Sequence, residues 1–134
     1  MVAKNITIAI GNQKGGVGKT TSTACIGAAL ALRGKRVLLV DLDAQQNLTF
    51  TLTQNEDPET SIYDTLVKDQ PLPIVPIREN LDLVPASLDL ARAEIDMATM
   101  MAREGILKSC LDEQKEKYDY ILMDCSPSLG IVTT

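Results

Sequence analysis

A glycine-rich segment at residues 13–21, which reads QKGGVGKTT, constrains the fold of this chain more than any other feature. Residues 5–10, just before it, alternate isoleucine with other side chains, a pattern typical of a β-strand that Gly11 breaks. Residues 20–33, just after it, are rich in alanine and carry apolar side chains at helical spacing, with Gly34 where a C-terminal cap belongs. The chain is therefore expected to run from a strand through a glycine-rich turn into a helix.

Three later apolar runs predict further strands. Residues 36–41 (RVLLVD) form a continuous apolar run closed by an acid, which is typical of a strand buried on both faces. With the first strand and helix this run makes a βαβ unit, whose crossover is right-handed in nearly every case. Residues 81–85 and 120–124 predict two more strands, and the second also ends in an aspartate. We expect an α/β fold with a mostly parallel sheet and helices on both faces.

Shorter signals between the strands predict helices and connections. Ser61, with Asp64 three residues on, makes a capping box for a short helix that ends near residue 67. The prolines at 71, 73 and 76 predict an extended connection. Ser87 can cap a helix that carries Leu90, Ala91, Glu94 and Ile95, and residues 106–111 mark the apolar face of another, with a bend allowed at 103–105.

The composition excludes several kinds of chemistry. Because the sequence has no histidine, histidine-based acid–base catalysis, Ser-His-Asp nucleophiles and most zinc sites are ruled out. The formal net charge of −5 offers no broad basic surface for nucleic acid or anionic lipid. Cys25, Cys110 and Cys125 are far apart and form no CxxC pair, so we expect small buried residues in a reducing compartment. With no apolar run of membrane-spanning length and no signal-peptide pattern, a cytoplasmic protein is expected.

The glycine-rich segment has the chemistry of a phosphate-binding loop. Glycines let the backbone turn tightly and aim several N–H groups inward, and the start of a helix adds partial positive charge. Lys19 supplies a full positive charge, and Thr20 is placed so that its hydroxyl can bind Mg²⁺. The alternative is a glycine-rich turn that binds nothing.

The loop departs from the ordinary P-loop pattern in a specific way. Gln13 stands where that pattern requires glycine, and a second lysine, Lys14, follows it. In this respect the sequence resembles the ParA/MinD family of deviant Walker-A ATPases, whose motif KGGxGK[ST] is matched by residues 14–20. Residues 40–47 resemble the family's VDLDPQGN segment, with Ala44 and Gln46 in place of its proline and glycine.

Two later segments extend the resemblance over nearly the whole chain. Residues 80–94 resemble a segment typical of the ParA/Soj partition branch. Residues 118–130 are similar to the Walker-B strand and the switch region after it, with Ser126 where a proline is usual. The fold that the resemblance implies is that of a P-loop NTPase.

The resemblance implies a role for each matched acid and lysine. Lys14 would reach across an ATP-sandwich dimer to the partner's phosphates. Asp43 would position the attacking water, the alternative being a helix cap at the end of a strand. Asp124 would be the Walker-B acid of the Mg²⁺ shell. For Asp41 two roles stay open, a share in the Mg²⁺ environment or a hydrogen bond to the loop.

ATP and Mg²⁺ are the cofactors that the resemblance implies. The residues expected to contact the nucleotide are Lys14, Gly15, Gly16, Val17, Gly18, Lys19, Thr20 and Thr21, and those expected around the metal are Thr20, Asp124 and Asp41.

Members of the family are roughly twice as long as this chain, so residues 1–134 are expected to form the N-terminal part of a single ATPase domain. The implied partners are a second copy in a homodimer, nonspecific DNA bound largely by the later part of the protein, and a centromere-binding, ParB-like protein. The implied location is the cytoplasm at the nucleoid, with no membrane. The alternatives are a MinD-like ATPase that acts at the membrane, and a nucleotide-gated regulator with little turnover. Because the family's first strand pairs with the Walker-B strand and with one beyond residue 134, a bare edge is expected here.

Overall fold

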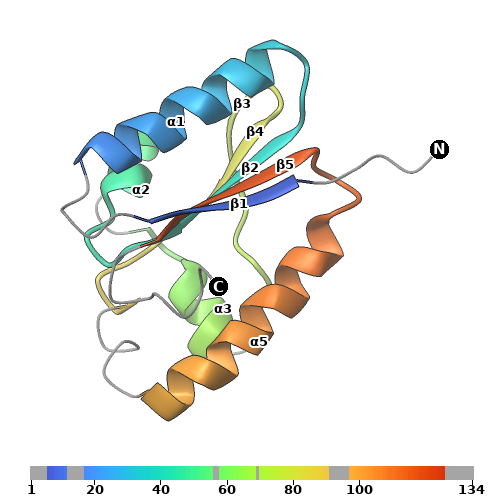
Figure 1. The fold of residues 1–134 in the computed structure, drawn as a ribbon. Helices are drawn as coiled ribbons and strands as arrows, with labels where there is room; N and C mark the ends of the chain where they lie inside the picture. The colour runs from blue at the N-terminus through green and yellow to red at the C-terminus, as the bar shows by residue number, and fades with distance from the viewer. Residues whose placement is uncertain (1–5, 12–16, 56–57, 69, 91–96, 126–134) are drawn as a thin grey trace.

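The computed structural model describes residues 6–11, 17–55, 58–68, 70–90 and 97–125, and these form a sheet covered by helices on both faces (Figure 1). The five strands lie in the order β1-β5-β2-β4-β3. Their bounds are β1 Ile6–Gly11, β2 Val37–Leu42, β3 Val75–Arg78, β4 Leu81–Val84 and β5 Tyr120–Cys125. The helices are α1 Val17–Leu32, α2 Asn47–Thr53, α3 Ile62–Lys68 and α5 Met97–Gln114. The predicted α/β architecture is confirmed.

Strand β2 is the centre of the sheet, and all six of its residues are buried. It pairs in parallel with β5 on one side and with β4 on the other. Its apolar run has no polar face because both faces of a parallel sheet are covered. The sheet is mostly parallel, since β3 alone among the described strands runs antiparallel to its neighbour.

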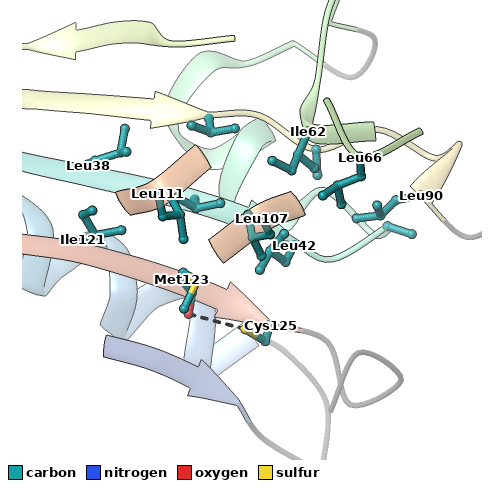
Figure 2. Close-up of a cluster of buried hydrophobic side chains, with 14 of the residues drawn as sticks. Leu38, Leu42, Ile62, Leu66, Leu90, Leu107, Leu111, Ile121, Met123 and Cys125 are labelled. Atoms are coloured by element: carbon teal, nitrogen blue, oxygen red, sulfur yellow. Dashed lines mark hydrogen bonds between the residues drawn. The ribbon is translucent and has the colours of Figure 1, made fainter. Parts of the chain in front are cut away.

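Successive side chains of β2 enter two different cores, as the period of two in a strand requires. Leu38, Val40 and Leu42 pack with residues of α3 and α5, the arrangement that Figure 2 shows for Leu38 and Leu42 beside Leu107 and Leu111. Val37 and Leu39 instead pack in the cluster that includes Ala31 of α1 and Leu48 of α2. The central strand thus joins the two halves of the core.

Helix α1 lies directly against the sheet. Gly27 faces Leu39 so closely that a Cβ atom at Gly27 would lie 2.8 Å from Leu39 Cδ2. The helix ends in a Schellman motif, in which Gly34 takes a φ of 84° and the N–H groups of Gly34 and Lys35 donate to the carbonyls of Ala31 and Leu30. The C-terminal cap predicted at Gly34 is confirmed.

The capping box predicted at the start of α3 is also present. The Ser61 N–H donates to Asp64 Oδ2 at 2.8 Å, and the Tyr63 N–H donates to Ser61 Oγ at 3.2 Å. This helix lies beside α5 on one face of the sheet, while α1 and α2 cover the other (Figure 1).

Three local predictions need correction. The connection around Pro76 is a strand, β3, which tolerates a proline because it forms an edge of the sheet. Residues 103–105 do not interrupt α5, since Gly105 costs a helix interior only about 1 kcal/mol. Cys25 is exposed, although Cys110 is half-buried and Cys125 buried as expected. The helix predicted after Ser87 lies mostly outside the described residues, which show only its start at Leu90.

Candidate functional site

The predicted acids meet where β2 and β5 end. Asp41 and Asp124 are register partners on these neighbouring parallel strands, so the two residues lie side by side. Asp43 comes two residues after Asp41, just beyond the end of β2. In open α/β sheets the carboxyl ends of the strands are where ligands bind.

Helix α1 brings Thr20 to the same place. The Thr20 hydroxyl donates to Asp124 Oδ2 at 3.0 Å, and the two residues are only 4% and 1% exposed. Thr20 lies in the first turn of α1, where backbone N–H groups have no partners within the helix. A buried hydroxyl and a carboxylate are oxygen donors of the kind that Mg²⁺ binds, so this pair fits a metal site.

Asp41 is bound to the loop that follows its own strand. Asp41 Oδ1 accepts the Asp43 N–H at 3.1 Å, while Oδ2 accepts both the Thr49 N–H at 2.9 Å and the Thr49 hydroxyl at 2.6 Å. Burial raises the pKa of Asp41 to about 7, against the opposing effect of these three hydrogen bonds, and the charge of Asp124 adds to the rise. These contacts are made with the turn after β2 and with α2, and both roles left open for Asp41, a share in the Mg²⁺ environment or a hydrogen bond to the phosphate-binding loop, stay predictions.

Asp43 lies in a tight turn between β2 and α2. Its carbonyl accepts the Gln46 N–H at 2.9 Å, and its Oδ1 accepts the Gln45 N–H at 3.0 Å. The N-cap of α2 is Gln46, so Asp43 does not cap this helix. Gln45, Gln46 and Asn47 line an open pocket of about 580 Å³, which leaves the outer side of the turn accessible.

Two residues to which the sequence analysis gave no role, Thr49 and Gln46, connect the turn after β2 to Ala86. Thr49 Oγ1 accepts the Ala86 N–H at 2.9 Å, and Gln46 Nε2 donates to the Ala86 carbonyl at 3.1 Å. Gln46 also adopts a φ of 61°, the left-handed conformation that favours glycine. The glycine at this position of the family pattern was a signal for that conformation. No sequence signal distinguished Thr49.

Some of the other predicted site residues lie within the described part of the structure, and others lie outside it. Thr21 is exposed on α1. The backbone of Val17, Gly18 and Lys19 forms the first turn of the helix, but their side chains lie outside the described part of the structure. Lys14, Gly15 and Gly16 also lie outside the described residues, so their predicted roles stay predictions.

Two kinds of feature are absent from the described residues. These residues contain no group of three or more histidines, cysteines or acids that could hold a metal ion by themselves. No helix among them is long and apolar enough to cross a membrane.

Comparison with known proteins identifies relatives over almost the whole chain. The profile of a family described as AAA domain matches residues 5–134. The sporulation initiation inhibitor protein Soj of Bacillus subtilis is 51% identical over 130 residues, which are 94% of this chain and 51% of that protein. The chain thus spans about half the length of the curated relatives it matches.

Solved structures with the same fold include relatives of the same kind. Cobyrinic acid a,c-diamide synthase from Mycobacterium smegmatis, with a bound ATP analogue and magnesium, is 40% identical with a TM-score of 0.85 over 96% of this chain and 55% of that one. A plasmid partition protein from Borrelia burgdorferi is 29% identical with a TM-score of 0.84 over 97% of this chain and 61% of that one. The fold, the family profile and the Soj relatives together show that the chain belongs to the AAA domain family, among its ParA/Soj-like P-loop proteins.

Proposed function

We propose that the complete protein is a ParA/Soj-like partition ATPase that binds and hydrolyses Mg-ATP. The observation that carries the proposal is the buried Thr20–Asp124 hydrogen bond, which lies under the first turn of α1 and beside Asp41. A hydroxyl and a carboxylate at a helix N-terminus suit a metal-bound polyphosphate, because the helix end attracts the anion and the oxygens bind the cation. Solved structures similar to this chain include proteins described with bound ADP or a bound ATP analogue and magnesium.

The proposed roles follow from the positions of the residues. Thr20 and Asp124 would hold Mg²⁺, and the loop at residues 14–21, with Lys19, would bind the phosphates. When bound there, Mg²⁺ would offset negative charge on the phosphates as the γ-phosphoryl group passes to water. Asp43 would orient the attacking water, a task that needs positioning more than proton removal. Lys14 would act on the phosphates of a second copy of the protein.

The biological setting is proposed from the relatives. Residues 1–134 would be the N-terminal part of one ATPase domain, and ATP would close a homodimer that binds DNA nonspecifically. A ParB-like protein bound at a centromere would stimulate hydrolysis, and the protein would act at the nucleoid in the cytoplasm. Support comes from the names of the relatives, which include a chromosome-partitioning ATPase Soj from Treponema pallidum and ParA from Myxococcus xanthus.

The variant Asp43→Ala tests the proposal in the complete protein. A group that acts mainly in the transition state lowers kcat when removed and leaves ground-state binding nearly unchanged. We therefore expect hydrolysis to fall by about 10²-fold or more, with the Kd for Mg-ATP unchanged in calorimetry. The variant should accumulate as an ATP-bound dimer on a sizing column, because hydrolysis reopens the dimer.

Asp112→Ala is the matched control, since Asp112 is an exposed acid near the end of α5, ion-paired with Lys115, and α5 leads into the start of β5 and not into its end at Asp124. Its turnover should equal that of the wild type. If Asp43→Ala abolishes ATP binding, Asp43 helps to bind the metal or stabilises the fold, and does not position water. A wild-type protein that binds ATP but shows no turnover with DNA and partner would instead favour the nucleotide-gated regulator.

A further inference from the structure

The turn that carries Asp43 is connected to a distant part of the chain through one hydroxyl group. Thr49 is fully buried in α2, and its Oγ1 contacts Asp41 on one side and the Ala86 peptide on the other. We infer that the Thr49 hydroxyl is a positioning group for Asp43, which it holds in place through Asp41. This inference rests on the proposed hydrolysis of ATP.

The first part of the connection is the backbone at Ala86, which hydrogen bonds on both sides hold in place. The neighbouring Pro85 carbonyl accepts the Ile62 N–H at 2.8 Å, and the Ser61 and Ser87 hydroxyls lie 3.1 Å apart in a hydrogen bond. The peptide between them is thus fixed on both sides to the start of α3. Its N–H donates to Thr49 Oγ1 at 2.9 Å, so this backbone sets the position of the hydroxyl.

The second part of the connection runs from the Thr49 hydroxyl to the turn that carries Asp43. Thr49 Oγ1 donates its hydrogen to Asp41 Oδ2 at 2.6 Å, the shortest contact that Asp41 makes with the loop. The other oxygen of that carboxylate accepts the Asp43 N–H at 3.1 Å. Rotation of the Asp41 carboxylate would therefore shift the backbone of Asp43, and the Thr49 hydroxyl restrains that rotation.

The chemistry of a hydroxyl is what this position requires. A hydroxyl can accept from Ala86 and donate to Asp41 at the same time, whereas a methyl group can do neither. Valine has nearly the shape of threonine, so Thr49→Val removes both hydrogen bonds of the hydroxyl, leaves the Thr49 N–H bond to Asp41 and keeps most of the packing. Thr49→Ser keeps the hydroxyl and removes only the methyl group.

Steady-state ATP hydrolysis by the complete protein tests the inference. We expect Thr49→Val to lower kcat by about 10-fold or more with the KM for ATP nearly unchanged, because misplacing a reacting group by a fraction of an ångström is costly. Thr49→Ser should restore turnover. Thr53→Val is the matched control, because the Thr53 hydroxyl lies one turn further along α2, where it donates to the Thr49 carbonyl at 2.7 Å and accepts the Asn55 N–H at 3.1 Å, bonds that involve neither Asp41 nor Ala86. It should behave as wild type.

Hydrogen exchange provides a readout that does not depend on activity. In Thr49→Val the amides of Asp43 and Ala86 should exchange faster, while the amides of β2 and β5 keep their protection. Equal loss of protection throughout the sheet would mean that Thr49 only stabilises the fold, and would overturn the inference. So would a kcat for Thr49→Val equal to that of Thr53→Val.

If Thr49→Val does not fold, Thr49→Cys replaces it, because a thiol is a weaker donor and acceptor than a hydroxyl. Turnover in the order wild type, serine, cysteine supports the inference, and equal turnover overturns it. A wild-type protein without any turnover overturns the proposed function and this inference together. Normal wild-type turnover with an unaffected Thr49→Val overturns the inference alone.

Discussion

Strands β1 and β2 both lead into the candidate site, yet their surroundings differ. Strand β2 lies between β5 and β4, with every residue buried, and ends in the acids. Strand β1 leads into the glycine-rich segment, but among the described strands it pairs with β5 alone. Its Ile6 and Ile8 are 45% and 42% exposed. The acids therefore lie at the centre of the sheet, whereas the glycine-rich segment follows a strand at the edge of the described sheet.

Strand β3, at the opposite edge of the sheet, has features that protect an edge strand from pairing with another chain. Strand β3 has only four residues, includes Pro76 and has an irregular register opposite β4, features that oppose pairing with another chain. Strand β1 has six residues, no proline and three isoleucines. Its sequence is that of an inner strand, in agreement with the bare edge that the family resemblance predicted.

The largest effect that we expect from this difference is self-association of the 134-residue chain. An apolar unpaired edge is a template for pairing with a second copy, so light scattering should show oligomers or aggregates. Ile8→Lys should reduce this association, because a charge on an edge strand opposes pairing with another edge. Val75→Lys on β3 is the control and should leave the association unchanged. A stable monomer whose β1 amides are protected in hydrogen exchange would show that β1 is not an open edge, and would contradict this prediction.

A second prediction compares how much a buried side chain of β2 and an exposed side chain of β1 contribute to the free energy of unfolding. Leu39 in β2 is fully buried, so Leu39→Ala should lower the free energy of unfolding by about 2–5 kcal/mol through lost burial and a cavity. Ile8→Ala should cost about 1 kcal/mol or less, because nearly half of that side chain is already in solvent. Denaturant unfolding at low protein concentration measures both values. Similar losses in the two variants would show that Ile8 is covered in solution.

The smallest predicted effect concerns the turn after β2. Gln46 takes a left-handed φ and donates through its side chain to the Ala86 carbonyl. Gln46→Ala keeps the strained backbone and loses the hydrogen bond, so it should destabilise the fold by about 1 kcal/mol. Gln46→Gly loses the same hydrogen bond but relieves the strain, so its cost should be smaller. Should alanine prove no worse than glycine in thermal unfolding, the left-handed conformation is not maintained in solution.

Much of the fold could be predicted because apolar runs reveal strands without knowledge of their partners. The strands near residues 6, 37, 81 and 120 were expected within one residue of their bounds. Helix α2 was missed because its sequence, NLTFTLT, has three threonines and little helix propensity. It forms because Leu48 and Thr49 are buried against the rest of the protein, an effect of tertiary structure.

The site was predictable where it lies at the ends of strands, and at Thr20, which the glycine-rich motif indicated. Asp41, Asp43 and Asp124 could be placed because parallel strands end at the same edge of a sheet. Thr49 and Gln46 could not, because both act on Ala86, which is 37 and 40 residues away along the chain. Contacts over such separations depend on the folded topology and leave no periodic pattern in the sequence.

The close approach of Gly27 to Leu39 has a consequence at the far end of α1. The helix is a rigid rod, and its first turn holds Thr20 against Asp124 while a point halfway along rests on the central strand. A side chain at Gly27 would force either the Leu39 side chain or the helix to move. The spacing between the first turn of α1 and the acids is therefore set, in part, by a residue that has no side chain.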